Sequence, residues 1–188
     1  MAFMDRALLD EIPSKLLWVD LEMTGLDIKS DVILEVGAEI TDLNFKTLAS
    51  YEACIRRTDE ELGRMNDWAM EHHSSSGLIE RIKTHGRPEQ EVQHELIGFI
   101  NAQFNGKPAI LSGNSIHNDR IFIKKYWPGV ESLLHYRMLD VSSFKIIMQA
   151  KYRVMYEKKE VHRAFDDIQA SIAELQFYLD RFATDANK

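Results

Sequence analysis

Residues 16–22 read LLWVDLE, and residues 32–41 read VILEVGAEIT. The first stretch is a short apolar run that ends in acids. In the second, apolar residues alternate with the period of a half-buried strand. The alternating residues are Leu34, Val36, Ala38 and Ile40. A third candidate strand, LASYEACIRR, occupies residues 48–57, and three strands so closely spaced predict an antiparallel meander.

Helical and shorter strand patterns follow this meander. One helix is predicted by apolar residues that recur every four positions, at Val92, Leu96, Ile100 and Phe104. AILSGN (109–114) predicts a short strand, DRIFIKKYW (119–127) a helix, and HYRMLDV (135–141) a strand leading into a helix from Ser142. The last helix is marked by Ile168, Ile172, Leu175, Leu179 and Phe182. This order predicts an α/β fold with a mixed central sheet flanked by helices.

Length and composition limit the class of protein. The chain has 188 residues, of which 45% are hydrophobic, and no linker or repeat interrupts it, so we expect one domain over 1–188 with its core at about 16–182. The single cysteine, Cys54, excludes an intramolecular disulfide, and no cysteine–histidine cluster has zinc spacing. The first residues lack the apolar run of a secretory signal, and no stretch approaches the ~20 apolar residues of a membrane span. We therefore expect a cytoplasmic protein without a membrane partner.

The formal net charge of −7 argues against a partner that is a long nucleic acid. Proteins that track long nucleic acids usually carry a basic face, because neutralisation of phosphates supplies most of their affinity.

Two acids stand at the end of the first predicted strand. Asp20 and Glu22 are two residues apart, so alternation places both side chains on one face. Two carboxylates there repel each other unless a cation lies between them. The alternative is a strand that ends in solvent with ordinary surface acids.

Two further motifs contain acids. Asp119 follows a turn of Ser, Gly and Asn, where it could simply cap the next helix. HRAFDD places His162 five residues before Asp167 at the start of the final helix, where acids also complement the helix dipole. Each motif alone has an ordinary structural explanation, whereas their combination and order are specific.

The combination resembles the DEDD exonucleases, in the His-containing branch with an RNase H-like fold, and within it the oligoribonuclease subfamily. The three family motifs correspond to WVDLEMTGLD (18–27), GNSIHND (113–119) and HRAFDDI (162–168). The surrounding MNDWAMEHH (65–73) and HYRMLDVSS (135–143) agree with it, and the resemblance runs from about Leu16 to Phe182.

The resemblance implies a role for each matching residue. It assigns the four metal-binding acids to Asp20, Glu22, Asp119 and Asp167, and the general base to His162. Four carboxylates carry about −4, which two Mg²⁺ or Mn²⁺ ions would balance, and such ions prefer oxygen ligands. Two ions ~3.5–4 Å apart can stabilise both the attacking water and the leaving 3′-oxygen. A neutral imidazole is suited to removing a proton from that water near pH 7.

Asp166 and Asp140 are the rival acids. In helical spacing Asp167 aligns with the small and apolar row Ala164, Ser171 and Leu175, whereas Asp166 aligns with Arg163, Gln169 and Ala173. The apolar row is expected to face the sheet, which favours Asp167. Asp140 ends a strand without a partner acid in a matching motif, so we interpret it as structural.

The resemblance also implies substrate-binding residues. It assigns the stacking of terminal bases to Leu26 and Trp68, and the 5′ end of a very short oligonucleotide to His73, Ser115, Tyr136, Arg137 and Ser142. Stacking is tolerant of base identity, and an arginine can grip a phosphate through two hydrogen bonds. In the family, Tyr136 and His73 belong to a site completed across a homodimer, and Tyr136 counts as an active-site residue. The alternatives are a core tryptophan at Trp68 and buried, hydrogen-bonded residues at Tyr136 and His73.

Two features depart from the family pattern. His117 adds an imidazole near the predicted metals, and we interpret it as a solvent-facing turn residue. The segment 151–161 is rich in lysine and lacks glycine, and it either closes over substrate or lies on the surface.

The sequence therefore predicts a 3′-to-5′ exoribonuclease that degrades dinucleotides and slightly longer RNA, or short DNA, to 5′-mononucleotides. A proofreading or tRNA-trimming exonuclease of the same superfamily is the alternative enzyme, but it would need a surface for a longer strand. A binding module that has lost its chemistry is the non-catalytic alternative, and all five expected positions are filled. An RNase H-like endonuclease or transposase lacks this third motif.

Overall fold

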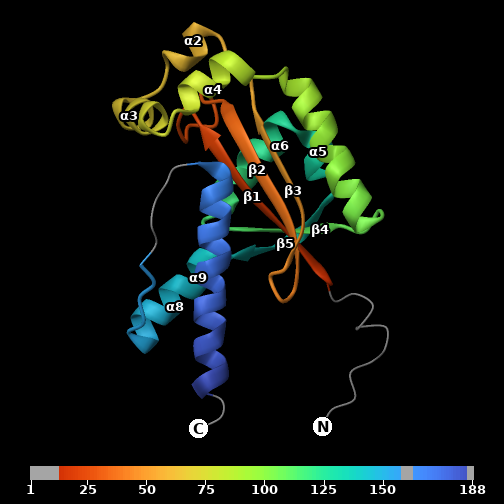
Figure 1. Ribbon diagram of the computed structural model, residues 1–188, viewed down its shortest axis with the longest axis vertical. Helices are drawn as coiled ribbons and strands as arrows, with labels where there is room; N and C mark the ends of the chain where they lie inside the picture. The colour runs from red at the N-terminus through yellow and green to blue at the C-terminus, as the bar shows by residue number, and fades with distance from the viewer. Residues whose placement is uncertain (1–12, 158–162, 186–188) are drawn as a thin grey trace.

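A five-stranded mixed sheet forms the centre of the computed structural model, which describes residues 13–157 and 163–185. Its strands are β1 (Lys15–Met23), β2 (Ile33–Asp42), β3 (Thr47–Cys54), β4 (Ala109–Gly113) and β5 (Leu134–Asp140), in the spatial order β3-β2-β1-β4-β5 (Figure 1). β1, β2 and β3 pair antiparallel, and β4 pairs parallel with both β1 and β5. The predicted meander and mixed sheet are confirmed.

The helices of the described residues cover both faces of this sheet. They are α2 (Asp59–Leu62), α3 (Asp67–Ser75), α4 (Leu78–His85), α5 (Glu89–Phe104), α6 (His117–Tyr126), α7 (Pro128–Glu131), α8 (Val141–Tyr152) and α9 (Ala164–Asp185). In Figure 1 the long helix α9 crosses one face of the sheet, and α5 lies on the opposite side of the molecule. None of the helices within the described ranges is both long and apolar enough to cross a membrane.

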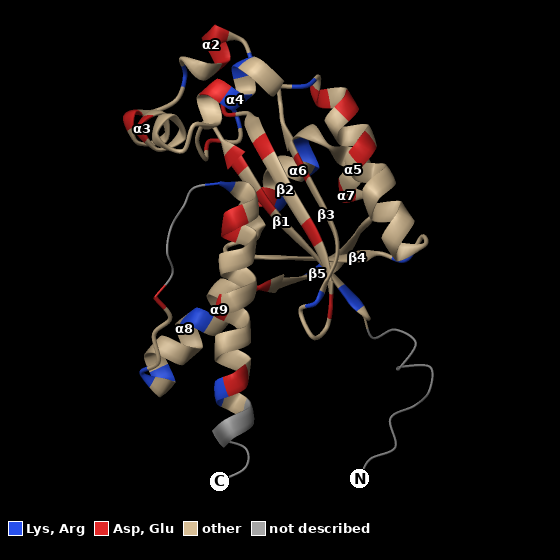
Figure 2. Cartoon of the chain, viewed as in Figure 1, with Lys and Arg blue, Asp and Glu red and all other residues tan. Residues whose placement is uncertain are grey.

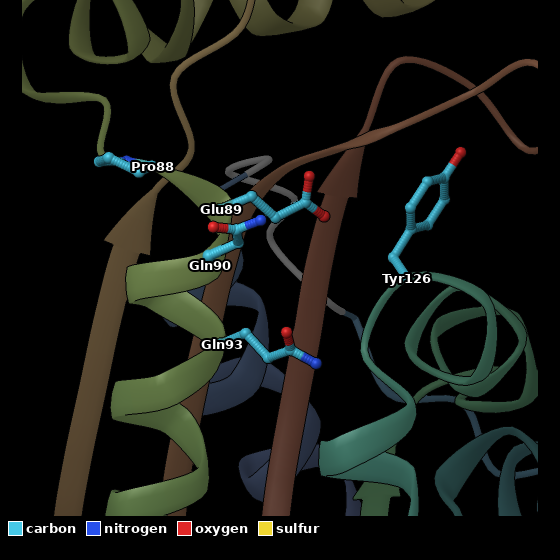
Figure 3. Close-up of a pocket in the computed structure, with 5 residues that line it drawn as sticks. All are labelled: Pro88, Glu89, Gln90, Gln93 and Tyr126. Atoms are coloured by element: carbon cyan, nitrogen blue, oxygen red, sulfur yellow. The ribbon is translucent and has the colours of Figure 1, made fainter.

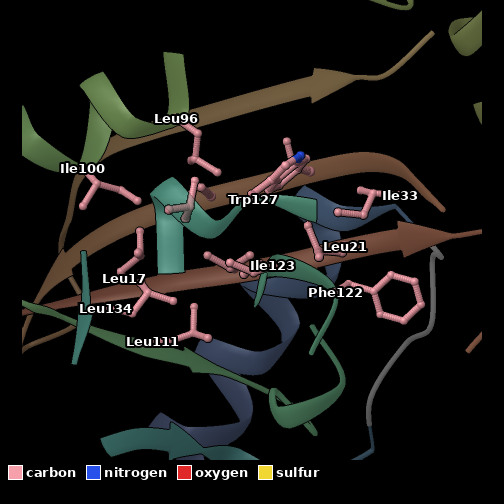
Figure 4. Packing of buried hydrophobic residues seen from close by; sticks show 14 of the residues in the cluster. Leu17, Leu21, Ile33, Leu96, Ile100, Leu111, Phe122, Ile123, Trp127 and Leu134 are labelled. Atoms are coloured by element: carbon pink, nitrogen blue, oxygen red, sulfur yellow. The ribbon is translucent and has the colours of Figure 1, made fainter. Parts of the chain in front are cut away.

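Alternation along β1 divides its side chains between two buried layers. Leu17, Val19 and Leu21 pack in the layer that contains the apolar stripe of α5 and residues of α6 and α7. Figure 4 shows this layer around Ile123 and Trp127. Leu16 and Trp18 pack in the other layer with α9. Since Asp20 and Glu22 continue the even-numbered positions, the pleat directs them to the α9 face.

The structure contains three helices between β3 and α5 that the apolar spacing did not predict. They are short, so none presents a long apolar stripe. Capping chemistry marks two of them: Thr58 and Glu61 form a capping box at the start of α2, and the Asn66 side chain accepts a hydrogen bond of 2.8 Å from the backbone N–H of Ala69 in α3. These signals could have located the helices from the sequence.

The predicted last helix is confirmed as α9, but the burial of its apolar residues decreases toward its C-terminal end. Ile168 and Leu175 are buried, whereas Leu179 and Phe182 are each 37% exposed. Figure 1 shows the reason, because the lower part of α9 runs past the strands of the sheet. There the Phe182 ring packs edge-on against Tyr152 of α8, with 5.6 Å between ring centroids.

Candidate active site

Three acids from two elements come together at one end of the sheet. Asp20 and Glu22 lie on β1, and Asp167 lies in the first turn of α9. One carboxylate oxygen from each lies within 4.8 Å of the other two, and all three residues are half-buried. Figure 2 shows the acidic end of β1 beside the acidic start of α9. The structure thus unites three of the four predicted metal ligands.

A glycine on the neighbouring strand lets α9 begin at this point. Gly37 of β2 pairs directly with Asp20. A Cβ atom at Gly37 would lie 2.9 Å from the carbonyl carbon of Ala164 and 3.0 Å from the nitrogen of Phe165. The start of α9 therefore rests on the strand backbone at a distance that a larger side chain would prevent.

The chemistry of this cluster fits a divalent metal ion. Carboxylates this close repel one another, and a cation between them removes the repulsion. Divalent ions such as Mg²⁺ take oxygen ligands, usually one or two carboxylates together with other oxygen donors. Asp20, Glu22 and Asp167 are therefore the residues that would hold the ion.

Asp119 lies beside the cluster but is not among the acids whose carboxylate oxygens all lie within 4.8 Å of one another. It lies in the first turn of α6, is buried, and its Oδ1 accepts a hydrogen bond of 2.9 Å from the backbone N–H of Leu21, the residue between Asp20 and Glu22. Burial raises the pKa of Asp119 to about 7, although backbone N–H donors lower it and the charge of Asp140 adds to the rise. A nearby cation would oppose this rise by stabilising the charged form.

Asp166 and Asp167 differ in solvent exposure and in their position relative to the acid cluster. Asp166 is exposed, whereas Asp167 is half-buried and belongs to the acid cluster. The row that the sequence aligned with Asp167 faces inward, because Ala164, Ser171 and Leu175 are all buried. The geometry therefore favours Asp167 over Asp166 as a ligand.

The predicted base, His162, lies outside the described residues. So does the end of the segment 151–161, of which residues 153–157 follow α8 without regular structure.

Two of the predicted substrate-binding serines meet at the end of β4. The hydroxyls of Ser115 and Ser142 lie 3.1 Å apart. Asp140 organises them, since its Oδ1 accepts hydrogen bonds from the backbone N–H groups of Ser115 (3.0 Å) and Ser142 (2.9 Å). The structural role predicted for Asp140 is confirmed. His117 is solvent-facing as predicted, and its Nδ1 lies 3.8 Å from Asp140 Oδ2.

Leu26 and Trp68 are both accessible to a ligand. Leu26 is 69% exposed and Trp68 is 59% exposed, so the alternative of a core tryptophan is wrong. The Trp68 ring stacks on His72, with 4.0 Å between centroids. His73, on the same helix α3, lies with Nε2 2.9 Å from the carbonyl oxygen of Met23 at the end of β1. This contact places α3 beside the strand that carries Asp20 and Glu22.

Tyr136 and His73 differ in accessibility. Tyr136 is 72% exposed on the edge strand β5, with the Arg137 guanidinium 5.1 Å from its ring centroid. His73 is 2% exposed, and its Nδ1 lies 3.8 Å from Glu22 Oε2. The buried, hydrogen-bonded alternative therefore describes His73 but not Tyr136.

Sequence reasoning missed the residues that hold the Leu26 turn. The Asp31 carboxylate accepts hydrogen bonds of 2.8 Å from the Thr24 hydroxyl and from the backbone N–H of Asp27. A Cβ at Gly25 would lie 2.5 Å from Asp31 Oδ2, so a larger residue there would have to displace this carboxylate. The Thr-Gly pair and the following Asp are ordinary turn signals that could have indicated this support.

A surface cavity of about 430 Å³ lies elsewhere, between the start of α5 and the end of α6. Its lining residues are Pro88, Glu89, Gln90, Gln93 and Tyr126 (Figure 3). Glu89 already accepts from Arg57 (2.8 Å) and from the Trp127 indole (3.1 Å). This cavity contains none of the clustered acids.

Comparison with known proteins agrees with the geometry of the acid cluster. An exonuclease family model, RNase_T, matches residues 17–175. An oligoribonuclease of Francisella tularensis is 41% identical over 165 residues, which cover 87% of this chain and 93% of the relative. The chain belongs to the oligoribonuclease family of exonucleases. The human mitochondrial oligoribonuclease is also 41% identical, over 174 residues that cover 90% of this chain and 73% of the relative.

Solved structures share the fold at low sequence identity. Escherichia coli exonuclease I, in a zinc-bound complex with single-stranded DNA, has a TM-score of 0.72 at 14% identity and covers 89% of this chain. Exonuclease I from Methylocaldum szegediense has a TM-score of 0.64 at 17% identity and covers 87%. The chain spans 41% and 40% of the lengths of these two proteins. The RNase H-like exonuclease fold predicted for this oligoribonuclease-family chain is thereby confirmed.

Proposed function

We propose that this chain, as a single domain over 1–188, is a metal-dependent 3′-to-5′ exoribonuclease that hydrolyses very short RNA to 5′-mononucleotides. The observation that carries the proposal is the cluster of Asp20, Glu22 and Asp167, whose carboxylate oxygens lie within 4.8 Å of one another. The family membership supports it, because relatives at 41% identity are named oligoribonucleases.

The metal would be Mg²⁺ or Mn²⁺, bound as two ions. Asp20, Glu22 and Asp167 would hold them together with Asp119, which hydrogen-bonds to β1 between the first two acids. When bound, such ions stabilise the attacking and leaving oxygens of a phosphodiester displacement. The protein supplies carboxylates on a strand and two helices, which fix the ligands more firmly than loops would.

His162 is the proposed general base. A neutral imidazole can take the proton of the attacking water at physiological pH. The proposal for this residue rests on the third motif, in which His162 stands five residues before Asp167.

The substrate is proposed to bind across the exposed side of this site. Leu26 follows β1 directly, and α3, which carries Trp68, contacts the end of β1 through His73. Both apolar side chains are exposed there and can stack on terminal bases without selecting among them. Ser115 and Ser142 offer hydroxyls at the end of β4.

The 5′ phosphate end of the substrate is proposed to be held by these serines and by the exposed Arg137. An arginine fork matches the geometry of a phosphate group. A net charge of −7 suits a ligand with few phosphates, because only a few charges need neutralisation.

A homodimer with shared sites is proposed as the assembly. Its support is four exposed apolar side chains on the edge strand β5 and on α8: Tyr136 (72%), Met138 (39%), Ile146 (64%) and Ile147 (50%). Exposed apolar side chains mark an interaction site where they form one contiguous patch. Tyr136 would then reach the partner's substrate.

The substrate contact predicted for His73 stays a prediction, because its ring is 2% exposed in the single chain. A cytoplasmic location also stays a prediction.

The experiment that tests the proposal compares substrate lengths. The protein is incubated with 5′-labelled RNA dinucleotides and, separately, with 20-mers, in Mg²⁺, Mn²⁺ or EDTA. We expect a strong preference for the dinucleotide that EDTA abolishes, and a shallow dependence on salt. Rapid attack on 20-mers with inert dinucleotides would favour the proofreading or trimming alternative. Binding without hydrolysis under every condition would indicate the non-catalytic module.

A further inference from the structure

A buried carboxylate on β2 contacts the first residues of α9. Glu35 has no exposed surface. Its Oε2 accepts a hydrogen bond of 3.2 Å from Nε of Arg163, and its Oε1 accepts one of 3.1 Å from the Nη2 of the same guanidinium. The backbone N–H of Ala164, the first residue of α9, donates to Oε2 at 3.4 Å. A helix start has several N–H groups without partners in the helix, and here a strand residue serves one of them.

Two neighbours complete this group of side chains. Arg163 also donates to Glu52 of β3 at 3.0 Å, and Arg81 of α4 forms ion pairs with both Glu35 and Glu52. The thiol of Cys54 donates to Glu35 at 3.3 Å. Each guanidinium therefore has a carboxylate partner within the group.

The group lies beside the acid cluster in the register of the sheet. Glu35 pairs directly with Glu22, and Gly37 pairs directly with Asp20. Residues opposite each other in an antiparallel pair point to the same face. The contacts that fix the start of α9 are thus one strand away from the two strand-borne acids.

Arg163 is linked to Asp167 through the helix itself. The backbone N–H of Asp167 donates to the carbonyl oxygen of Arg163 at 2.9 Å. The guanidinium of Arg163 thus ties the turn that presents Asp167 to β2, while Gly37 sets how closely the same turn approaches the strand. Both contacts bear on where the carboxylate of Asp167 lies relative to Asp20 and Glu22.

Stability alone is a poor explanation for this buried ion pair. Removing two charges from water costs free energy, and well-packed apolar residues often stabilise a fold as well or better. What an ion pair adds is a defined geometry, which a bidentate guanidinium–carboxylate contact supplies.

We propose that Glu35 and Arg163 are positioning residues that hold the first turn of α9 so that Asp167 completes the metal cluster with Asp20 and Glu22. The inference rests on the proposed function for the role of the metal. It assigns no contact with substrate to either residue. The two guanidiniums of the group, Arg81 and Arg163, each form ion pairs with both Glu35 and Glu52.

The test measures metal affinity separately from stability and activity. Variants Glu35→Gln, Arg163→Gln and Arg163→Lys are compared with the wild type by calorimetric titration of the metal-free protein with Mn²⁺, and their melting temperatures are recorded without metal. Partners that orient metal ligands typically contribute 10–100-fold to affinity. We expect Arg163→Gln and Glu35→Gln to weaken Mn²⁺ binding about tenfold or more, with Arg163→Lys intermediate, because lysine keeps the charge but not the fork.

Arg57→Gln is the matched control. Arg57 is also a largely buried arginine that donates to the backbone of β2, at Ile33 (2.8 Å), but its carboxylate partners are Glu89 of α5 (2.8 Å) and Glu61 of α2 (3.6 Å). Its loss should lower the melting temperature and leave the Mn²⁺ affinity within twofold of wild type. Glu52→Gln, which leaves the Glu35 pair intact, should weaken binding less than Glu35→Gln.

Mn²⁺ affinity in Arg163→Gln within twofold of wild type, whatever its melting temperature, would overturn the inference. Should Glu35→Gln not fold, Arg163→Gln and Arg163→Lys still decide the question. Hydrolysis of dinucleotides is assayed independently. A wild type that binds Mn²⁺ but leaves dinucleotides intact would refute the proposed function, while weakened binding in the variants would still support the positioning role.

Discussion

The two faces of the sheet bury different kinds of side chain. Towards α5 and α6 the buried layer is apolar, with Leu17, Leu21 and Ile123 among its members. Towards α9, Trp18 and Ile168 share the layer with fully buried glutamates. These are Glu35 and Glu39 on β2 and Glu174 on α9.

Buried carboxylates are unfavourable without partners, and each of these has them. Glu39 accepts from the Thr47 hydroxyl at 2.5 Å and from Gln169 of α9. Glu174 accepts from Asn114 at 3.1 Å and from the Tyr178 hydroxyl at 2.8 Å. Hydrogen bonds are directional, whereas apolar contacts are not. The difference indicates that apolar packing dominates on one face, whereas directional hydrogen bonds orient α9 beside the candidate active site on the other.

The largest expected effect separates two adjacent acids on the α9 face. Asp167→Ala should reduce dinucleotide hydrolysis by about 10³-fold (~4 kcal/mol), because a lost ligand disrupts the metal's stabilisation of the reacting oxygens. Asp166→Ala should stay within about threefold of wild type, since its exposed side chain lies outside the cluster. Initial rates at saturating Mg²⁺ measure both. If both variants lose the same amount of activity, Asp167 has no special role relative to Asp166, which would contradict its assignment as a metal ligand.

On the opposite face, a packing change should affect stability and spare the chemistry. Leu96→Ala removes a fully buried side chain from α5 and should lower the free energy of unfolding by about 3 kcal/mol. Urea denaturation gives this value, and activity per folded molecule should be unchanged. A lower metal affinity in this variant would contradict the interpretation that the α5 face contributes stability and the α9 face positions the metal ligands.

Two glycines sharpen the same comparison. Gly37→Ala should cost about 1–3 kcal/mol of stability and also reduce activity, because the new methyl group meets the backbone of α9. Gly98→Ala is the control at an exposed position of α5, where an added Cβ meets nothing within 4 Å. It should stabilise the protein by about 0.5–1 kcal/mol. Thermal denaturation with a parallel activity assay tests the pair, and a Gly37→Ala variant of normal activity would show that α9 can shift freely.

The sheet and the long helices were predictable because periodicity depends only on the order of residues along the chain. Alternation in 32–41 and the four-residue spacing from Val92 both correspond to real elements. The short helices α2 and α3 were not found, because they are too short to show a period and are marked only by caps.

In the candidate site, the two-residue spacing of Asp20 and Glu22 predicts their common face, whereas the roles of Asp119 and Asp167 were predicted from the resemblance to the exonuclease family. What could not be predicted was the support around them. The contact of Arg163 with Glu35 spans 128 positions in the sequence, and the burial of His73 depends on how α3 packs against β1. Such contacts follow from tertiary packing, which no local pattern encodes.

The smallest expected effect concerns the thiol that borders the α9 layer. Burial raises the pKa of Cys54 to about 12, and the neighbouring Glu35 carboxylate adds to the rise. The folded state therefore keeps the thiol proton where the unfolded chain, with a pKa near 9, loses it. The contribution of this pKa difference to the free energy of unfolding is fully present below pH 9 and declines as the pH rises towards 12.

Because the thiolate is the reactive species, iodoacetamide at pH 9 should alkylate the native protein at least ~100-fold more slowly than the urea-unfolded chain. The Cys54→Ser variant provides the blank. If the alkylation rate of the native protein instead rises with a midpoint near pH 9, the layer between the sheet and α9 opens to solvent. The hydrogen-bonded α9 face would then not be more tightly ordered than the apolar face towards α5.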